Sequence, residues 1–253
     1  VLASAGPGLQ KRAAVKMNAL GLDKNARVRP DHTLRLLCDQ IAALAGGIDY
    51  DLYISPTQPE LIAAEMLGRP SIVLGQRVAS DPITAAERFR IGKALFLVAE
   101  QALVLRDLSV REIGHLFVAL GQAAQPPFEI PITVKDPGSV EKQARALSKL
   151  LARRERKALG ALLPGLGQQF ATVNLAEFAR ALGYGSNHMG LVAAGDPVAA
   201  LHDAAHITGA STGPEMADLV QYVVSEEYFA ARIELGIAPG LPAERPQGRE
   251  PRS

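Results

Sequence analysis

Two histidines four residues apart are the clearest candidates for chemistry in this sequence. Residues 202–206 read H-D-A-A-H and lie in a stretch whose apolar spacing predicts a helix, so His202 and His206 share one helix face. Two histidines at this spacing can bind one zinc ion, and an acidic residue after the first can deprotonate a zinc-bound water. One hypothesis is therefore a zinc-dependent hydrolase with Asp203 as its base.

Two features of the segment weaken this hypothesis. Asp203 is one methylene shorter than the glutamate of H-E-x-x-H and holds its carboxylate farther back, where proximity effects fall steeply. The third ligand would be Glu215 or Asp218, and residues 208–214 would have to fold back closely to deliver it. A chain with five histidines also produces such a pair by chance. An ordinary helix without metal is thus the favoured interpretation.

Three other segments have some resemblance to reactive motifs. Residues 112–115 read E-I-G-H, but Arg111 occupies the place of the first zinc-binding histidine and cannot ligate a metal. Residues 183–186 read G-Y-G-S without the preceding strand of a nucleophile elbow, so Ser186 is predicted to cap a helix. Cys38 lies in an apolar run and is predicted to be a small buried hydrophobe.

Composition narrows the class of protein. The 253 residues are 48% hydrophobic, enough for a substantial core, and 27 Lys and Arg against 26 Asp and Glu leave a formal charge of +1. We therefore expect no nucleic-acid partner. A single cysteine forms no disulfide within one chain and favours a reducing, cytoplasmic compartment. We expect no membrane span, because charged residues interrupt the longest apolar candidate, residues 89–105.

The chain divides into three predicted regions. Residues 1–31 carry six basic residues with scattered Gly and Pro, and we expect a linker or peripheral segment with little core. Residues 32–237 are predicted to form a single globular domain. Residues 238–253 hold four prolines among charges and are predicted to be a disordered tail. Because the sequence begins at Val1 without a secretion signal, we expect a piece of a longer polypeptide.

The predicted fold is α+β and mainly α, a helical domain with a small β-sheet. A helix capped by Asp31 covers residues 34–44, and strands at 50–55 and 71–74 are expected to form a ribbon. A largely buried central helix follows Pro82, and another begins at Ser109, where S-x-x-E predicts a capping box. Beyond Ser139 every strong segment is helical: 140–151, 154–163, 166–182, 188–194, 197–206, 214–224 and 226–235.

This order of elements resembles a known enzyme family. A helix, a strand ending Tyr53-Ile54-Ser55-Pro56, a strand at residues 70–75 and a long apolar helix resemble the heat-shock-type zinc peptidases of the gluzincin clan. The chain is also similar to a domain at the C-terminal end of large tetratricopeptide-containing proteins of myxobacteria. That likeness includes the Gly195-Asp196 turn and residues 225–230, and it spans about residues 34–236.

The resemblance implies that the zinc motif is lost. The two histidines of the peptidase motif fall on Lys93 and Leu97, its glutamate on Ala94, and the later ligand glutamate near Gly183. None of these side chains offers a metal ligand, and alanine cannot activate water. What the resemblance implies is a non-catalytic pseudo-peptidase without metal or cofactor, an interaction or scaffold module of a larger protein with a protein partner. A small-molecule binding domain in the former cleft is a third possibility.

Overall fold

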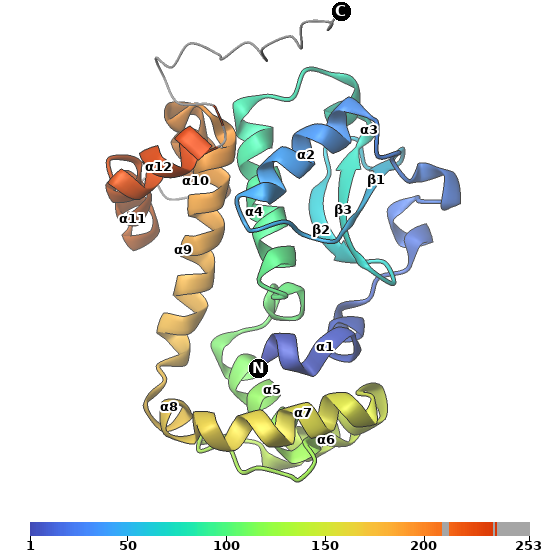
Figure 1. The fold of residues 1–253 in the computed structure, drawn as a ribbon, viewed down its shortest axis with the longest axis vertical. Helices are drawn as coiled ribbons and strands as arrows, with labels where there is room; N and C mark the ends of the chain where they lie inside the picture. Colours follow the sequence, from blue (N-terminus) through green and yellow to red (C-terminus); the bar gives the residue numbers. More distant parts are fainter. Residues whose placement is uncertain (209–212, 235, 237–253) are drawn as a thin grey trace, which may run out of the picture.

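Two long helices, α4 (Ala85–Ala99) and α9 (Leu175–Ala194), pack side by side at the centre of the molecule (Figure 1). This computed structural model describes residues 1–208, 213–234 and 236, so the predicted tail 238–253 lies outside the described residues. The predicted class, mainly α with a small sheet, is confirmed. None of the described helices has both the length and the apolar character that crossing a bilayer requires.

The sheet has three strands in the order β1-β3-β2. β1 (Asp51–Ser55) runs parallel to β3 (Pro70–Gly75), and β2 (Ile62–Met66) runs antiparallel to β3 at the other edge. One face packs on α2 (Thr33–Ala43) and α4, with Leu52 and Ile72 fully buried between them.

The predicted two-strand ribbon is wrong because it omits β2. The β2 sequence I-A-A-E-M carries little β-propensity and lies between proline- and glycine-containing turns. Pairing with β3 and packing on α4 therefore stabilise this strand, and neither interaction is visible in its local sequence.

Residues 1–31 contribute to two cores, so the expectation of little core there is wrong. α1 (Leu2–Gln10) packs on α7 (Arg153–Leu162), with Ala5 and Leu9 fully buried. Leu20 and Leu22 cover the second face of the sheet beside Tyr53. Between these contacts the chain forms three short 3-10 helices, which give no apolar periodicity in the sequence: Lys11–Ala13, Met17–Leu20 and Lys24–Ala26.

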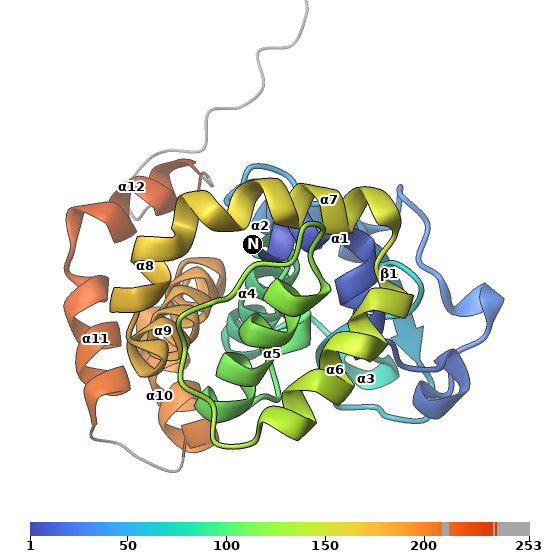
Figure 2. The same ribbon diagram turned by 90° about the horizontal axis from the view of Figure 1, so that it is seen from below.

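A helical layer forms the end of the molecule opposite the sheet. Figure 2 shows this layer from below, with α6 (Pro137–Leu150) and α7 beside α5 (Val110–Ala123). Ser109 caps α5 through the predicted capping box, which is confirmed: its hydroxyl accepts from the Glu112 amide at 3.3 Å and the Glu112 carboxylate accepts from the Ser109 amide at 2.8 Å. Before α4 the sheet is followed by α3 (Gln76–Ser80). After α4 come a 3-10 turn (Leu103–Leu105), α5 (Val110–Ala123), α6 (Pro137–Leu150), α7 (Arg153–Leu162), a second 3-10 turn (Leu163–Leu166) and α8 (Gly167–Thr172).

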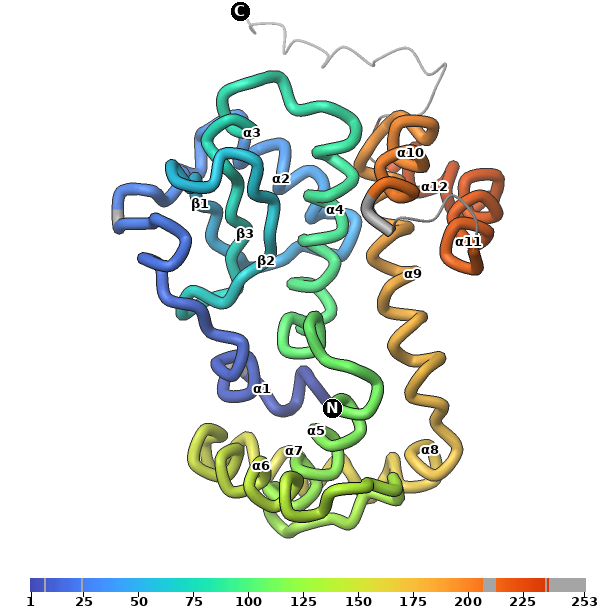
Figure 3. Tube along the Cα trace, turned by 180° about the vertical axis from the view of Figure 1, so that it is seen from behind, coloured from blue at the N-terminus to red at the C-terminus, as the bar shows by residue number. Residues whose placement is uncertain are grey.

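Three C-terminal helices cover the upper part of α9, as Figure 3 shows from behind. They are α10 (Pro197–Thr208), α11 (Pro214–Val223) and α12 (Glu226–Glu234). Phe89 of α4 and Tyr228 of α12 are buried in the core that they share with α9.

Two predicted helix ends are wrong. α9 runs unbroken through residues 183–186, so Ser186 lies inside the helix and its hydroxyl donates to the Gly183 carbonyl at 2.9 Å. Packing on α4 stabilises α9, so the helix continues through Gly183 and Gly185 despite the low helix propensity of glycine. α2 is capped by His32 instead of Asp31, with the His32 Nδ1 accepting from the Leu34 amide at 3.1 Å.

Candidate binding pocket at the central helix

A capping box formed by Thr84 and Glu87 defines where α4 begins, and hence which of its residues face the pocket. The Thr84 hydroxyl accepts from the Glu87 amide at 3.2 Å, and the Glu87 carboxylate accepts from the Thr84 amide at 2.8 Å. Arg77 also donates to Glu87 at 2.6 Å. The net effect lowers the pKa of Glu87: burial by itself raises it, but hydrogen bonds from Thr84 and Arg77 outweigh burial.

α4 and α9 cross at two glycines. A Cβ on Gly92 would lie 2.8 Å from the Cα of Gly190, and a Cβ on Gly190 would lie 2.6 Å from the carbonyl oxygen of Phe89. The backbones are therefore in direct contact at this point. The Cγ of Lys93 lies 2.9 Å from that same Gly190 Cβ position, so Lys93 extends along the surface of α9.

The three positions of α4 that the resemblance aligns with the zinc motif line one pocket of about 290 Å³. Lys93, Ala94 and Leu97 are joined there by residues of the edge strand β2, of the chain after α4 and of α9. The other lining residues are Ile62, Ala63, Ala64, Arg90, Arg106 and Ser186. The spacing i, i+1, i+4 thus presents three side chains to one space, as a helical zinc motif would.

Gly183 is not among the residues that line this pocket. It lines a neighbouring pocket of about 260 Å³ that shares Leu97, Arg106 and Ser186 with the first. Ser186, one turn further along α9, is therefore the α9 residue that faces Lys93 and Leu97 across the pocket. Sequence reasoning missed Ser186 as a lining residue, although its i+3 spacing from Gly183 places both on one helix face.

Three cationic side chains line the pocket, and two of them are paired. Arg90 donates through Nε to Asp203 at 2.9 Å. Arg106 donates through Nη1 to the Ala64 carbonyl at 2.6 Å and to the Glu65 carboxylate at 3.0 Å. Sequence reasoning gave neither arginine a role, because both pairings depend on how separate elements pack.

Lys93 is the exception among these cations. Within the described part of the chain its ammonium makes no hydrogen bond or ion pair, and it lies 5.3 Å from the centre of the Phe89 ring. Burial lowers the pKa of Lys93, and nearby Arg90 acts in the same direction, while the charges of Glu215 and Asp203 oppose the shift. The pocket thus holds a partly buried cation without a close anionic partner among the described residues.

The alternative zinc site is not assembled in the described residues. No group of three or more His, Cys, Asp or Glu side chains is arranged there to hold a metal ion, and His202, His206 and Glu215 are all exposed. Asp203, the proposed base, is buried against Arg90. Asp218, the other possible ligand, pairs with His188 instead.

His188 on α9 is a second residue that sequence reasoning missed. Its Nε2 lies 2.7 Å from the Asp218 carboxylate on α11, and its ring stacks on Tyr222 with centroids 3.8 Å apart. A lone histidine in an apolar helix gives no local signal for such a contact. The pair joins α9 to α11.

Cys38 is buried, as the sequence predicts. Burial, assisted by the charge of Asp39, raises the pKa of its thiol to about 12. The thiolate is therefore negligible near neutral pH, and Cys38 is unsuited to nucleophilic chemistry.

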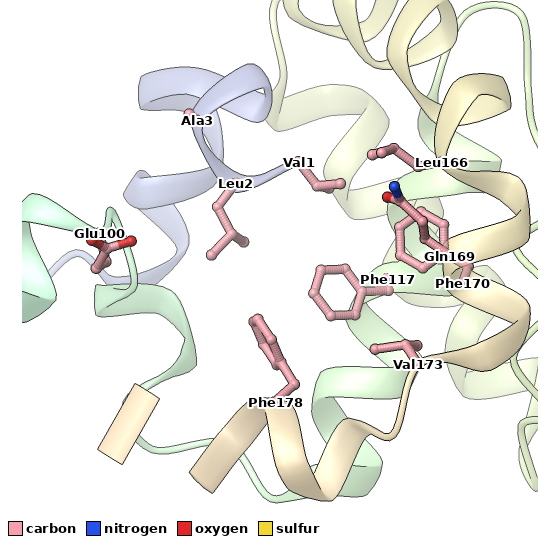
Figure 4. Close-up of a pocket in the computed structure, with 10 residues that line it drawn as sticks. All are labelled: Val1, Leu2, Ala3, Glu100, Phe117, Leu166, Gln169, Phe170, Val173 and Phe178. Atoms are coloured by element: carbon pink, nitrogen blue, oxygen red, sulfur yellow. The ribbon is translucent and has the colours of Figure 1, made fainter. Parts of the chain in front are cut away.

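A second cavity, of about 380 Å³, lies between α1 and the helical layer (Figure 4). The rings of Phe117, Phe170 and Phe178 face it, with Phe117 at 5.9 Å and 5.8 Å from the other two by ring centroid. The lining is mostly apolar and contains none of the motif positions of α4.

Comparisons with protein-family models, with curated proteins and with solved structures find no match for this chain.

Proposed function

We propose that this chain is a non-catalytic pseudo-peptidase domain that serves as an interaction or scaffold module of a larger, tetratricopeptide-associated protein. The observation that carries the proposal is the shared pocket of Lys93, Ala94 and Leu97 on α4. At positions with zinc-motif spacing, this pocket presents an amine, a methyl group and an isobutyl group.

The chemistry of these side chains opposes peptidase activity. A protonated lysine has no lone pair for Zn²⁺ and repels it electrostatically, and leucine has no donor atom. Alanine cannot take a proton from water. The fold alone does not imply activity, because function depends on the groups that the site contains.

The first experiment is elemental analysis by mass spectrometry of the purified chain and of the His202→Ala/His206→Ala variant. We expect far less than one zinc per chain in both proteins, and no cleavage of a casein substrate by either. About one zinc per chain, lost in the double variant, would overturn the proposal in favour of the hydrolase built on His202 and His206.

A second experiment restores the motif. The variant Lys93→His/Ala94→Glu/Leu97→His places two imidazoles and a carboxylate in the pocket, and Ser186→Glu adds a third ligand from α9. We expect this quadruple variant to bind zinc more tightly than one carrying Gly183→Glu, because Ser186 lines the pocket and Gly183 does not.

The control for motif restoration is a histidine pair at the same spacing on exposed α6, made as Glu141→His/Arg145→His. Both residues are exposed, with side-chain accessibilities of 62% and 77%. Two ligands on a solvated helix should bind zinc weakly. If the quadruple variant binds no better than this control, the relation of the pocket to a zinc site is wrong.

The same proposal includes a cytoplasmic location and a protein partner. A cytoplasmic location fits a chain whose one cysteine is a buried, unreactive thiol, and a protein partner follows from the proposed role as an interaction module. A small-molecule ligand is the second candidate function, supported by the open volume of about 290 Å³ beside Lys93.

A further inference from the structure

We propose that the pocket at Lys93 binds the carboxylate of a small apolar ligand, with the Lys93 ammonium as its ion-pair partner. The inference rests on the proposed function, since it assumes that the pocket is used for binding rather than for metal catalysis. It adds the chemical class of the ligand and the residue that recognises it.

The Lys93 ammonium has no hydrogen-bond or ion-pair partner among the described residues. Burying a charge is unfavourable unless an opposite charge or hydrogen bonds compensate it. Arg90 and Arg106 meet this requirement with Asp203 and Glu65, whereas Lys93 has no such partner within hydrogen-bond distance among the described residues. An anion bound in the pocket would supply it through a charge-assisted hydrogen bond.

Apart from Arg90, Arg106 and Ser186, the side chains that line the pocket beside Lys93 are aliphatic. Ile62 and Ala64 of β2 and Ala94 and Leu97 of α4 offer aliphatic surface around the ammonium. A volume of about 290 Å³ lies just below the range typical of ligand pockets, roughly 300–1,000 Å³, so only a small ligand fits. The pocket therefore suits a small aliphatic group that ends in an anion.

The charge available in the pocket favours a carboxylate over a phosphate. A carboxylate carries one negative charge, which matches the one ammonium without a close partner. A phosphate carries up to two at neutral pH and would require Arg90 or Arg106 as well. Both guanidinium groups are already committed to carboxylates of the chain itself.

Two sources can supply such a carboxylate, a free small acid or the C-terminus of a polypeptide. The probes that separate them are N-acetyl-leucine and N-acetyl-Ala-Ala-Leu, each as the free acid and as the C-terminal amide. Equal affinity for the two acids indicates a small-molecule ligand, whereas tighter binding of the tripeptide indicates a polypeptide C-terminus. Both results support carboxylate recognition.

The experiment is isothermal titration calorimetry of the purified chain with these four probes and with inorganic phosphate. We expect each acid to bind at least about tenfold more tightly than its amide, the effect of losing one charge-assisted hydrogen bond. Lys93→Met should weaken the acids by a similar factor and leave the amides unchanged. Lys149→Met, which removes an exposed lysine of α6, should leave all affinities as in the wild type.

Four results would overturn the inference. They are no binding of either acid, equal binding of acid and amide, equal binding of the acids by wild type and Lys93→Met, or tighter binding of phosphate. The acid-to-amide comparison uses wild-type protein alone, so it stands even if Lys93→Met fails to fold. Zinc in the purified chain would instead refute the proposed function, whatever the titrations show.

Discussion

Arg90 on α4 and Asp203 on α10 lie 113 residues apart in the sequence and form an ion pair that joins the two helices. The Asp203 side chain is only 7% exposed, and the Arg90 side chain is 39% exposed. This contact positions α10 against the central helix. It also explains the role of an aspartate that lies between two histidines and resembles a catalytic base in the sequence.

Asp203→Ala should destabilise the protein by about 1–2 kcal/mol, because it removes a buried charge-assisted hydrogen bond and leaves Arg90 without its partner. Chemical denaturation followed by circular dichroism measures the change in the free energy of unfolding. The matched control is Asp49→Ala, since Asp49 pairs with Arg69 but is 84% exposed. We expect the control to change stability by less than about 0.5 kcal/mol, and an equal effect of both variants would contradict the structural role of the pair.

The crossing of α4 and α9 predicts opposite effects for two glycines of one helix. Gly190→Ala places a methyl group 2.6 Å from the Phe89 carbonyl and should cost about 1–3 kcal/mol through forced separation of the helices. Gly183→Ala meets no atom within 4 Å and should stabilise α9 by up to about 1 kcal/mol. Thermal unfolding of both variants is the test, and a rise in melting temperature for Gly190→Ala would show that the helices are not in backbone contact.

The contact between His188 and Asp218 should appear as a coupling energy. In a double-mutant cycle of His188→Ala and Asp218→Ala we expect about 1 kcal/mol, because the pair is half-buried and stacked on Tyr222. The exposed pair Glu141 and Arg145 provides a comparison cycle, with a coupling of roughly 0–0.5 kcal/mol. Additive effects at His188 and Asp218 would mean that the contact contributes nothing to stability.

Glu87 predicts a specific pH dependence. Its pKa is lowered in the folded state, so its stabilisation is present above its ordinary value of 4.5 and is lost as the pH falls through the folded value. Glu87→Gln should therefore be less stable than wild type at pH 7, by about 1 kcal/mol, and the difference should shrink below about pH 4.5.

The control for Glu87 is Glu112→Gln. It alters the equivalent capping box of α5, which is formed with Ser109 and is exposed to solvent. We expect a smaller loss there, because Glu87 is buried and bonded to Arg77, whereas Glu112 makes no ion pair with an arginine among the described residues. Urea denaturation between pH 3 and 7 measures both variants. A constant difference between wild type and Glu87→Gln across this range would refute the assignment.

The sequence by itself determined features whose causes are local. Ser109 and Glu112 stand three residues apart and predicted the capping box that begins α5. Apolar periodicity predicted the buried central helix and the mainly helical class, and the apolar surroundings of Cys38 predicted its burial. Caps and periodicity act within one or two turns, so the information that fixes them lies in adjacent residues.

Only the tertiary structure decided the features that depend on distant partners. β2 exists because β3 and α4 stabilise a segment of low intrinsic propensity, and α9 stays continuous because α4 packs along its glycines. The pocket joins Lys93 to Ala64, Arg106 and Ser186 from three other segments. These contacts form because the free energy of tertiary packing outweighs the intrinsic helix and strand propensities of the segments. A single sequence does not show directly which distant residues will come into contact.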